Sequence, residues 1–188
     1  MSTPQASLTF RKATPADIPI LLPLIRTAYR GNKGWTNESA LLNDKRISPD
    51  ALLAKITRPS GFVLVATRPE DPATVIACCE VELQPGAAHP TGYFGLFAVD
   101  PAIQGGGIGK QVLAKAEEHA REEWNAAEME MCVIWTRSEL IDYYVRRGYK
   151  HTGEKKPFPY AEVFEGAALR DDLHFIVLRK PLAVAAAA

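Results

Sequence analysis

The sequence predicts a mixed α/β fold, with a sheet that is antiparallel on one side and parallel on the other. Three apolar runs at residues 62–66, 75–83 and 94–99 are separated by turn-forming segments, which predicts an antiparallel meander. A glycine-rich turn, an amphipathic helix and a fourth apolar run at 129–135 follow. A strand, helix and strand of this length predict a parallel pair joined by a right-handed crossover.

The chain is expected to open with a short alternating strand at residues 8–12, followed by a helix. Thr14 is expected to cap that helix, with Pro15 at its first position and Asp17 three residues on, as in a capping box. Apolar residues recur at helical spacing as far as Tyr29. The first helix therefore has a defined start and one buried face.

The residues after this helix predict a glycine-containing break and two further helical segments. A break at 30–34 contains two glycines, and a second helical stretch is expected at 35–42. Ser48 is expected to start another helix, which ends near residue 56. Helices joined by a glycine-bearing loop could form a lid or one wall of a cleft.

The last third of the chain predicts a helix and a strand pair. Ser138 is expected to cap the helix and Gly148 to end it. Strands are expected at 149–154 and 173–180, around a long insert at 155–172.

The charge balance argues against a polyanionic partner. Lys and Arg together number 22, as do Asp and Glu, so the net charge is zero and gives no electrostatic footprint for nucleic acid or an anionic membrane. No apolar run approaches the roughly 20 residues that cross a bilayer, and the start of the chain does not resemble a secretory leader. We expect a cytoplasmic protein with one domain at 8–182 and flexible tails at 1–7 and 183–188. The cysteines lack metal-ligand spacing and are expected to be buried thiols, with no metal site: Cys78, Cys79 and Cys132.

The glycine-rich turn predicts a phosphate site. Four glycines lie within residues 105–109, at the start of a helix. Glycine leaves backbone amides uncovered and allows positive φ, so successive N–H groups can point at one anion where the helix dipole is positive. A Walker A motif would need other residues at Gln104 and Gln111, and a Rossmann GxGxxG motif would need glycine at Lys110. The alternative is a turn that only lets the helix pack close to the sheet.

The order of elements and three motifs resemble the GCN5-related N-acetyltransferase (GNAT) family. The motifs are the strand ending at 99–101 (Val-Asp-Pro), the QxxGxG turn that begins at Gln104, and the YxxxGY segment from Tyr144 to Tyr149, which follows Tyr143. The resemblance covers about residues 8–180, and the glycine turn together with YxxxGY is a specific combination.

This resemblance implies a twisted, mostly antiparallel sheet of about seven strands flanked by helices, with a splayed parallel pair formed by residues 94–99 and 129–135. It implies acetyl-CoA as the acyl donor, with its pyrophosphate on the amides of 105–110 and its pantetheine arm along the backbone of 97–99. The residues so assigned to acetyl-CoA are Phe97, Ala98, Val99, Gln104, Gly105, Gly106, Gly107, Ile108, Gly109 and Lys110.

The expected chemistry requires an acid and a base. The thiolate of CoA needs a proton or a hydrogen bond as it leaves, and Tyr144, four residues before Gly148, matches the family position that supplies it. Tyr144 could instead be a core aromatic, and Tyr143 is the second candidate. A protonated amine must lose a proton before it attacks. Glu80 and Glu82 share one face of a strand and are the candidate bases if that face lines the cleft; if it faces solvent, they are ordinary surface charges.

The acceptor is expected between the loop after the first helix and the insert at 155–172. Aromatic side chains there are the candidate substrate contacts: Tyr29, Trp35, Phe158 and Tyr160. With nearby carboxylates they suit an amine of apolar or cationic character and suit an acidic substrate poorly. The alternative is that they only anchor two long surface segments on the core.

By this resemblance the protein is expected to transfer an acetyl group from acetyl-CoA to the primary amine of a small molecule, or to a peptide N-terminus, by direct attack in a ternary complex. Two alternatives are a non-catalytic acyl-CoA sensor and a domain that binds a plain nucleotide. The oligomeric state is open, with a homodimer among the alternatives.

Overall fold

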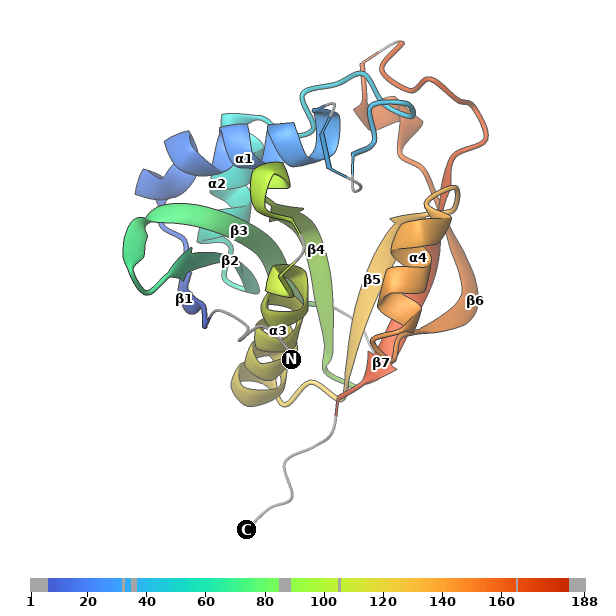
Figure 1. The fold of residues 1–188 in the computed structure, drawn as a ribbon. Coiled ribbons are helices and arrows are strands. Elements are labelled where there is room, and N and C mark those ends of the chain that lie inside the picture. Colours follow the sequence, from blue (N-terminus) through green and yellow to red (C-terminus); the bar gives the residue numbers. More distant parts are fainter. Residues whose placement is uncertain are drawn as a thin grey trace.

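The computed structural model describes residues 7–31, 33–34, 37–84, 89–104, 106–164 and 166–182. Within these residues, a seven-stranded sheet has the order β1-β2-β3-β4-β5-β7-β6 (Figure 1). Its strands are β1 (Thr9–Lys12), β2 (Gly61–Arg68), β3 (Asp71–Leu83), β4 (Thr91–Val99), β5 (Glu128–Ile134), β6 (Lys150–Pro157) and β7 (His174–Pro181). The helices are α1 (Ile18–Arg30), α2 (Pro49–Thr57), α3 (Ile108–Trp124) and α4 (Ser138–Val145), with short 3₁₀ turns at Pro15–Asp17, Pro101–Ile103 and Tyr160–Glu162.

The pairing of the strands confirms the predicted fold class. Strands β1 to β4 form an antiparallel meander, β4 and β5 are parallel, and β7 pairs antiparallel with both β5 and β6. Helix α3 makes the crossover between the parallel strands, because a parallel connection must return to the same end of the sheet.

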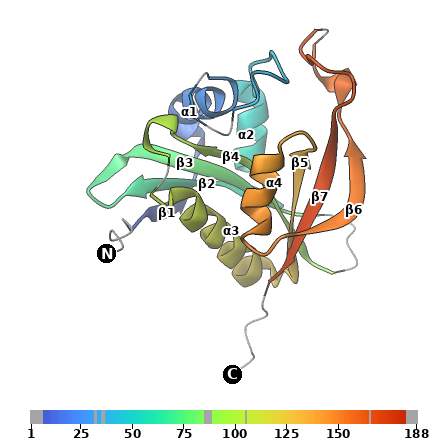
Figure 2. The same ribbon diagram turned by 45° about the vertical axis from the view of Figure 1, so that its right-hand side comes forward.

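Helices cover both faces of the sheet. Figures 1 and 2 show α1 and α2 on one face and α3 and α4 on the other. On the α1 and α2 face, Leu21 and Ile25 of α1 and Leu52 of α2 are buried in one cluster with Val63 and Val65 of β2. Because Leu21 and Ile25 are four residues apart, they lie on one side of α1, as the apolar periodicity predicts.

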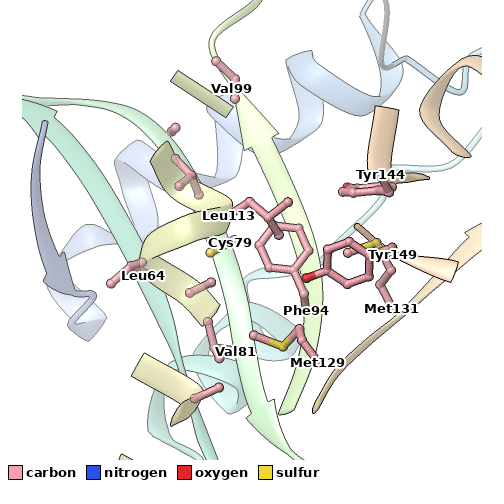
Figure 3. Packing of buried hydrophobic residues seen from close by; sticks show 14 of the residues in the cluster. Leu64, Cys79, Val81, Phe94, Val99, Leu113, Met129, Met131, Tyr144 and Tyr149 are labelled. Atoms are coloured by element: carbon pink, nitrogen blue, oxygen red, sulfur yellow. The ribbon is translucent and has the colours of Figure 1, made fainter. Parts of the chain in front are cut away.

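The other face has the larger core. Side chains from β3, β4 and β5 meet those of α3 and α4 there (Figure 3). Phe94 of β4 and Met129 of β5 lie beside Leu113 of α3, and Tyr144 of α4 packs edge to face on Phe94. This core holds α3 and α4 against the two parallel strands.

The parallel strands separate along their length, as the resemblance predicts. β4 and β5 pair only over Thr91–Tyr93 and Glu128–Glu130. Figure 1 shows the two strands meeting at one end and diverging toward the carboxyl end of β4. Beyond Tyr93, the backbone of β4 therefore has no strand partner on its β5 side within the described residues.

Several helix signals lie where the sequence predicts them. The Asp17 carboxylate accepts a hydrogen bond from the Thr14 backbone N–H at 2.7 Å. The Ser48 hydroxyl caps α2 by accepting from the N–H of Ala51 at 3.1 Å. Gly148 has φ 94°, and the next N–H, of Tyr149, bonds back to a carbonyl of α4, which is how a left-handed residue ends a helix.

Other local predictions are wrong. Residues 37–42 form turns and an isolated bridge to Ala168 instead of a helix, because their backbone pairs with the distant 158–172 segment; residues 35 and 36 lie outside the described part. Ser138 is the first residue of α4, and Arg137 occupies the cap position. β6 extends to Pro157, since its pairing with β7 continues beyond residue 154.

Candidate active site

A cavity of about 460 Å³ lies where β4 and β5 separate. β4 contributes residues 93–97 and β5 residues 131–134, while Tyr144 of α4 lines the cavity as well. The opposite wall comes from the segment between α1 and α2 and from the start of the β6–β7 connection. The cavity thus spans the two sides on which donor and acceptor are expected.

β4 is irregular where it borders this cavity. Its pairing with β3 shifts register between Cys78 and Glu80, and Leu96 has φ 45°. A residue with a Cβ at positive φ costs about 1–3 kcal/mol, and such strain gathers at functional sites. Bulges near active sites bend the strand and change the direction of its side chains.

The glycine-rich turn lies at the N-terminus of α3. Gly107 precedes the first helical residue, Ile108, and has φ 77°, while Gly106 has φ 47°. Glycine adopts this left-handed region without a steric penalty. The first N–H groups of a helix have no acceptor within it, so they suit an anion. The exposed Lys110 follows in the first turn, and Gly105 lies outside the described residues.

Gln104 and Gly109 both lie in crowded positions. The Gln104 side chain lies 3.5 Å from the Val99 carbonyl oxygen, and it fills the space that a Cβ at Gly34 would need. A Cβ at Gly109 would come within 2.7 Å of the Tyr143 hydroxyl and 3.1 Å of the Phe97 ring. Gln104 thus joins the end of β4 to the α1–α2 segment, and Gly109 allows α4 to approach the start of α3.

The two tyrosines of α4 lie in different surroundings. Tyr144 lines the cavity with only 4% of its surface exposed, and burial raises the pKa of its hydroxyl well above the usual value. The Tyr143 hydroxyl instead lies against Gly109, and the Arg147 guanidinium stacks 3.3 Å from the centre of the Tyr143 ring. Tyr144 is both a core aromatic and a wall of the cavity, so the two interpretations of its position are compatible.

Glu80 and Glu82 fit neither of the two alternatives drawn from the sequence. They share one face of β3, but that face lies under α2. Both oxygens of Glu80 accept from Lys55 at 2.8 Å, and Arg58 pairs with Glu80 at 3.1 Å and also with Glu82. Neither side chain lines the cavity, although Glu80 lies directly behind Gly95 in its wall.

The aromatic residues that were predicted to contact the substrate lie in different surroundings in the structure. Tyr29 lines the cavity. Phe158 is buried against the ring of Phe175, and Tyr160 packs on Phe158 and accepts a hydrogen bond from the Leu173 N–H at 2.6 Å. Phe158 lines a neighbouring cavity of about 410 Å³. These contacts favour an anchoring role for Phe158 and Tyr160, and Trp35 lies outside the described residues.

Sequence reasoning missed a charged network between the α1–α2 segment and the start of α4. Glu38 accepts from Arg30 at 2.9 Å and from Arg137 at 3.0 Å, and these three side chains are only 11–12% exposed. Arg46, which lines both cavities, was missed as well. No local pattern predicts these contacts, because they join segments far apart in the chain.

Two further searches of the described residues gave no candidates. None of their helices has the length and apolarity needed to cross a membrane. No group of three or more His, Cys, Asp or Glu side chains in the described ranges could hold a metal ion.

The comparisons with known proteins agree with the fold. A family profile described as the acetyltransferase (GNAT) family matches residues 29–149. A structure of an N-acetyltransferase from Staphylococcus aureus Mu50 has a TM-score of 0.70 at 13% identity, with 94% of this chain and 99% of that chain covered. The ribosomal-protein-alanine N-acetyltransferase of Brucella melitensis has a TM-score of 0.67 at 23% identity, with coverage of 93% and 99%.

A third structure was determined with coenzyme A. It is the PaiA N-acetyltransferase of Thermoplasma acidophilum, with a TM-score of 0.65 at 19% identity and the same coverage of 93% and 99%. A search of curated proteins finds no significant match. Because the family profile matches more than half of the sequence, the chain belongs to the acetyltransferase (GNAT) family, a family of N-acetyltransferase enzymes that use acetyl-CoA.

Proposed function

We propose that this protein moves an acetyl group from acetyl-CoA to the primary amine of a small molecule, by direct attack in a ternary complex. The observation that carries the proposal is one cavity that borders the unpaired edge of β4 and the Tyr144 side chain, and that continues to the α1–α2 segment. A donor and an acceptor can therefore meet within one cavity.

The donor side has the features that acetyl-CoA requires. The left-handed glycines before α3 and the amides of its first turn suit the pyrophosphate. The β4 backbone beyond Tyr93 has no β5 partner among the described residues, so it can pair with the amide groups of the pantetheine arm. We assign the donor to residues 97–99 and 104–110 on these grounds.

Tyr144 is assigned as the acid. When the amine nitrogen bonds to the acetyl carbon, the carbon–sulfur bond breaks and the thiolate takes up a proton. The Tyr144 hydroxyl is protonated at neutral pH, and burial raises its pKa further above the usual value, so the hydroxyl can donate to the leaving sulfur. A protonated amine gives one proton to solvent water before the attack, and the second proton that its nitrogen releases on forming the amide restores the Tyr144 hydroxyl.

A small acceptor fits better than a peptide N-terminus. The α1–α2 segment is tied to the β6–β7 connection, because Asn43 donates to the Ala167 carbonyl at 2.7 Å and Leu169 donates to that of Leu41 at 2.9 Å. The Glu38–Arg137 pair links the same segment to the start of α4. These ties join the two walls above the cavity and limit the room for a long chain.

The test is a turnover screen with acetyl-CoA and a panel of amines: polyamines, amino acids, aminoglycosides, arylamines and peptides. We expect CoA release together with an acetylated small amine by mass spectrometry. Binding of CoA without turnover of any amine would support the sensor alternative instead. Competition between CoA and ATP in a thermal-shift assay separates a nucleotide site from a CoA site, since only a ligand that binds raises the melting temperature.

A further inference from the structure

Arg46 occupies an unusual position in the wall of the proposed acceptor site. It lines both the 460 Å³ cavity and the neighbouring 410 Å³ cavity. Its guanidinium lies 4.5 Å from the centre of the Tyr29 ring, which also lines the larger cavity. Its φ is 63°, a conformation that residues with a Cβ rarely adopt. The Arg46 backbone N–H donates a hydrogen bond to the Asp44 carboxylate at 3.1 Å. Such strain in a cavity wall points to a function for the side chain.

The charges around Arg46 leave it without a counter-ion. The Glu38 carboxylate forms ion pairs with Arg30 and Arg137, and the Asp44 carboxylate forms an ion pair with Arg30 at 2.5 Å. Arg46 makes no ion pair with a carboxylate of the described residues. The group of two carboxylates and three guanidinium ions therefore carries one surplus positive charge. A cation in a partly dehydrated site is costly unless an anion pairs with it.

We propose that the acceptor amine also carries a carboxylate, which Arg46 binds. This inference rests on the proposed function, and it names the substrate class of the same site. The guanidinium presents parallel N–H groups that match the two oxygens of a carboxylate, and no carboxylate of the described residues forms an ion pair with it.

The other charged groups of the larger cavity are compatible with an amine that bears a carboxylate. Lys156 is paired with Glu130 at 2.6 Å, so it is already neutralised. Glu162 lies exposed in the walls of both cavities, and it makes no ion pair with Arg46. It can attract the positive amine while Arg46 holds the negative end. An amino acid has this arrangement of charges, whereas a polyamine has no group for Arg46.

The experiment compares matched acceptors within the turnover screen. Each of the common α-amino acids is assayed beside its amide, which has a neutral group in place of the carboxylate, and beside its decarboxylated amine, which lacks the group entirely. We expect the best acid to exceed its amide and its amine about 10- to 100-fold in kcat/KM, since a hydrogen-bonded ion pair contributes of this order. If amines are acetylated but the best acceptors lack a carboxylate, this inference is wrong and the proposed function stands. If no amine is acetylated, the proposed function itself fails.

Two variants test the role of Arg46. Arg46→Gln should bring kcat/KM for the acid down to that of its amide and leave the affinity for acetyl-CoA unchanged. Lys45→Gln makes the same charge change at an exposed neighbour and should keep the preference for the acid. Arg46→Lys keeps the positive charge but lacks the planar guanidinium group. Its kcat/KM for the acid should therefore lie between the values of the parent and of Arg46→Gln. A preference for the acid that survives in folded Arg46→Gln would overturn the assignment.

Discussion

Replacing Tyr144 by Phe is the sharpest test of the proposed chemistry, because it removes one hydroxyl and keeps the ring. The ring packs edge to face on Phe94, Tyr143 and Tyr149, with centroids 6.3, 5.3 and 5.9 Å apart. The hydroxyl makes no hydrogen bond with another described residue, so the substitution breaks none. We therefore expect the free energy of unfolding to change by less than about 1 kcal/mol.

The rate should respond far more strongly than the stability. If the Tyr144 hydroxyl protonates the leaving sulfur, kcat of Tyr144→Phe should fall by about 10²–10⁴-fold. This loss corresponds to about 3–5 kcal/mol of transition-state stabilisation. Because burial raises the pKa of Tyr144 well above its usual value, the acid stays protonated, and kcat of the parent should not fall through Tyr144 ionisation up to about pH 10.

The assay measures kcat and KM by thiol release with the best amine from the screen, and the CoA affinity by calorimetry. Tyr143→Phe is the matched control, because it removes the same group from the adjacent residue, whose hydroxyl lies against Gly109. We expect kcat of this control to stay within about threefold of the parent. A Tyr144→Phe enzyme that works at the parent rate would leave Tyr144 as a core aromatic, and an equal loss in Tyr143→Phe would transfer the role to the neighbour.

Three further predictions concern binding and stability. Gly107→Glu places a negative side chain at the N-terminus of α3 and should weaken CoA by orders of magnitude in calorimetry, whereas Gly153→Glu, also at positive φ but in β6, should not. Arg137→Gln removes one of the two cations paired with the Glu38 carboxylate, which keeps Arg30, and should cost about 1–2 kcal/mol in urea unfolding; an unchanged free energy of unfolding would refute this. Arg11 holds the pKa of Asp17 well below its usual range, mainly by hydrogen bonds, so this stabilisation is complete above about pH 5 and is lost as the pH falls further. Asp17→Asn should therefore cost about 1–2 kcal/mol at pH 7, with a difference from the parent that shrinks between pH 5 and pH 2 and does not stay constant.

Most of the architecture could be predicted from local patterns. The meander, the crossover through α3 and the left-handed Gly148 follow from apolar spacing and from residues within a few positions of each other. The helix expected at 35–42 failed because propensity competes with tertiary pairing, and the described part of this stretch pairs with residues near 168. Element boundaries shifted by a few residues where a partner strand continued, as in β6.

In the candidate site, too, local features could be predicted from the sequence and long-range contacts could not. Residues close in sequence were predicted together, so the glycines before α3 and Tyr144 in the cavity wall lie where the motifs suggest. The alternation of β3 correctly placed Glu80 and Glu82 on one face, but it carried no information about what covers that face.

The sequence by itself determined the fold class, the family resemblance and the glycine-rich turn before α3, because each depends on periodicity or on a motif within one short segment. Only the tertiary structure decided which charges meet. Lys55 reaches Glu80 from 25 positions away, and Arg137 reaches Glu38 from 99 positions away. Arg46 forms no ion pair within the described residues, because the Glu38 and Asp44 carboxylates beside it pair with other arginines. An ion pair depends on distance in space, which a one-dimensional pattern does not contain.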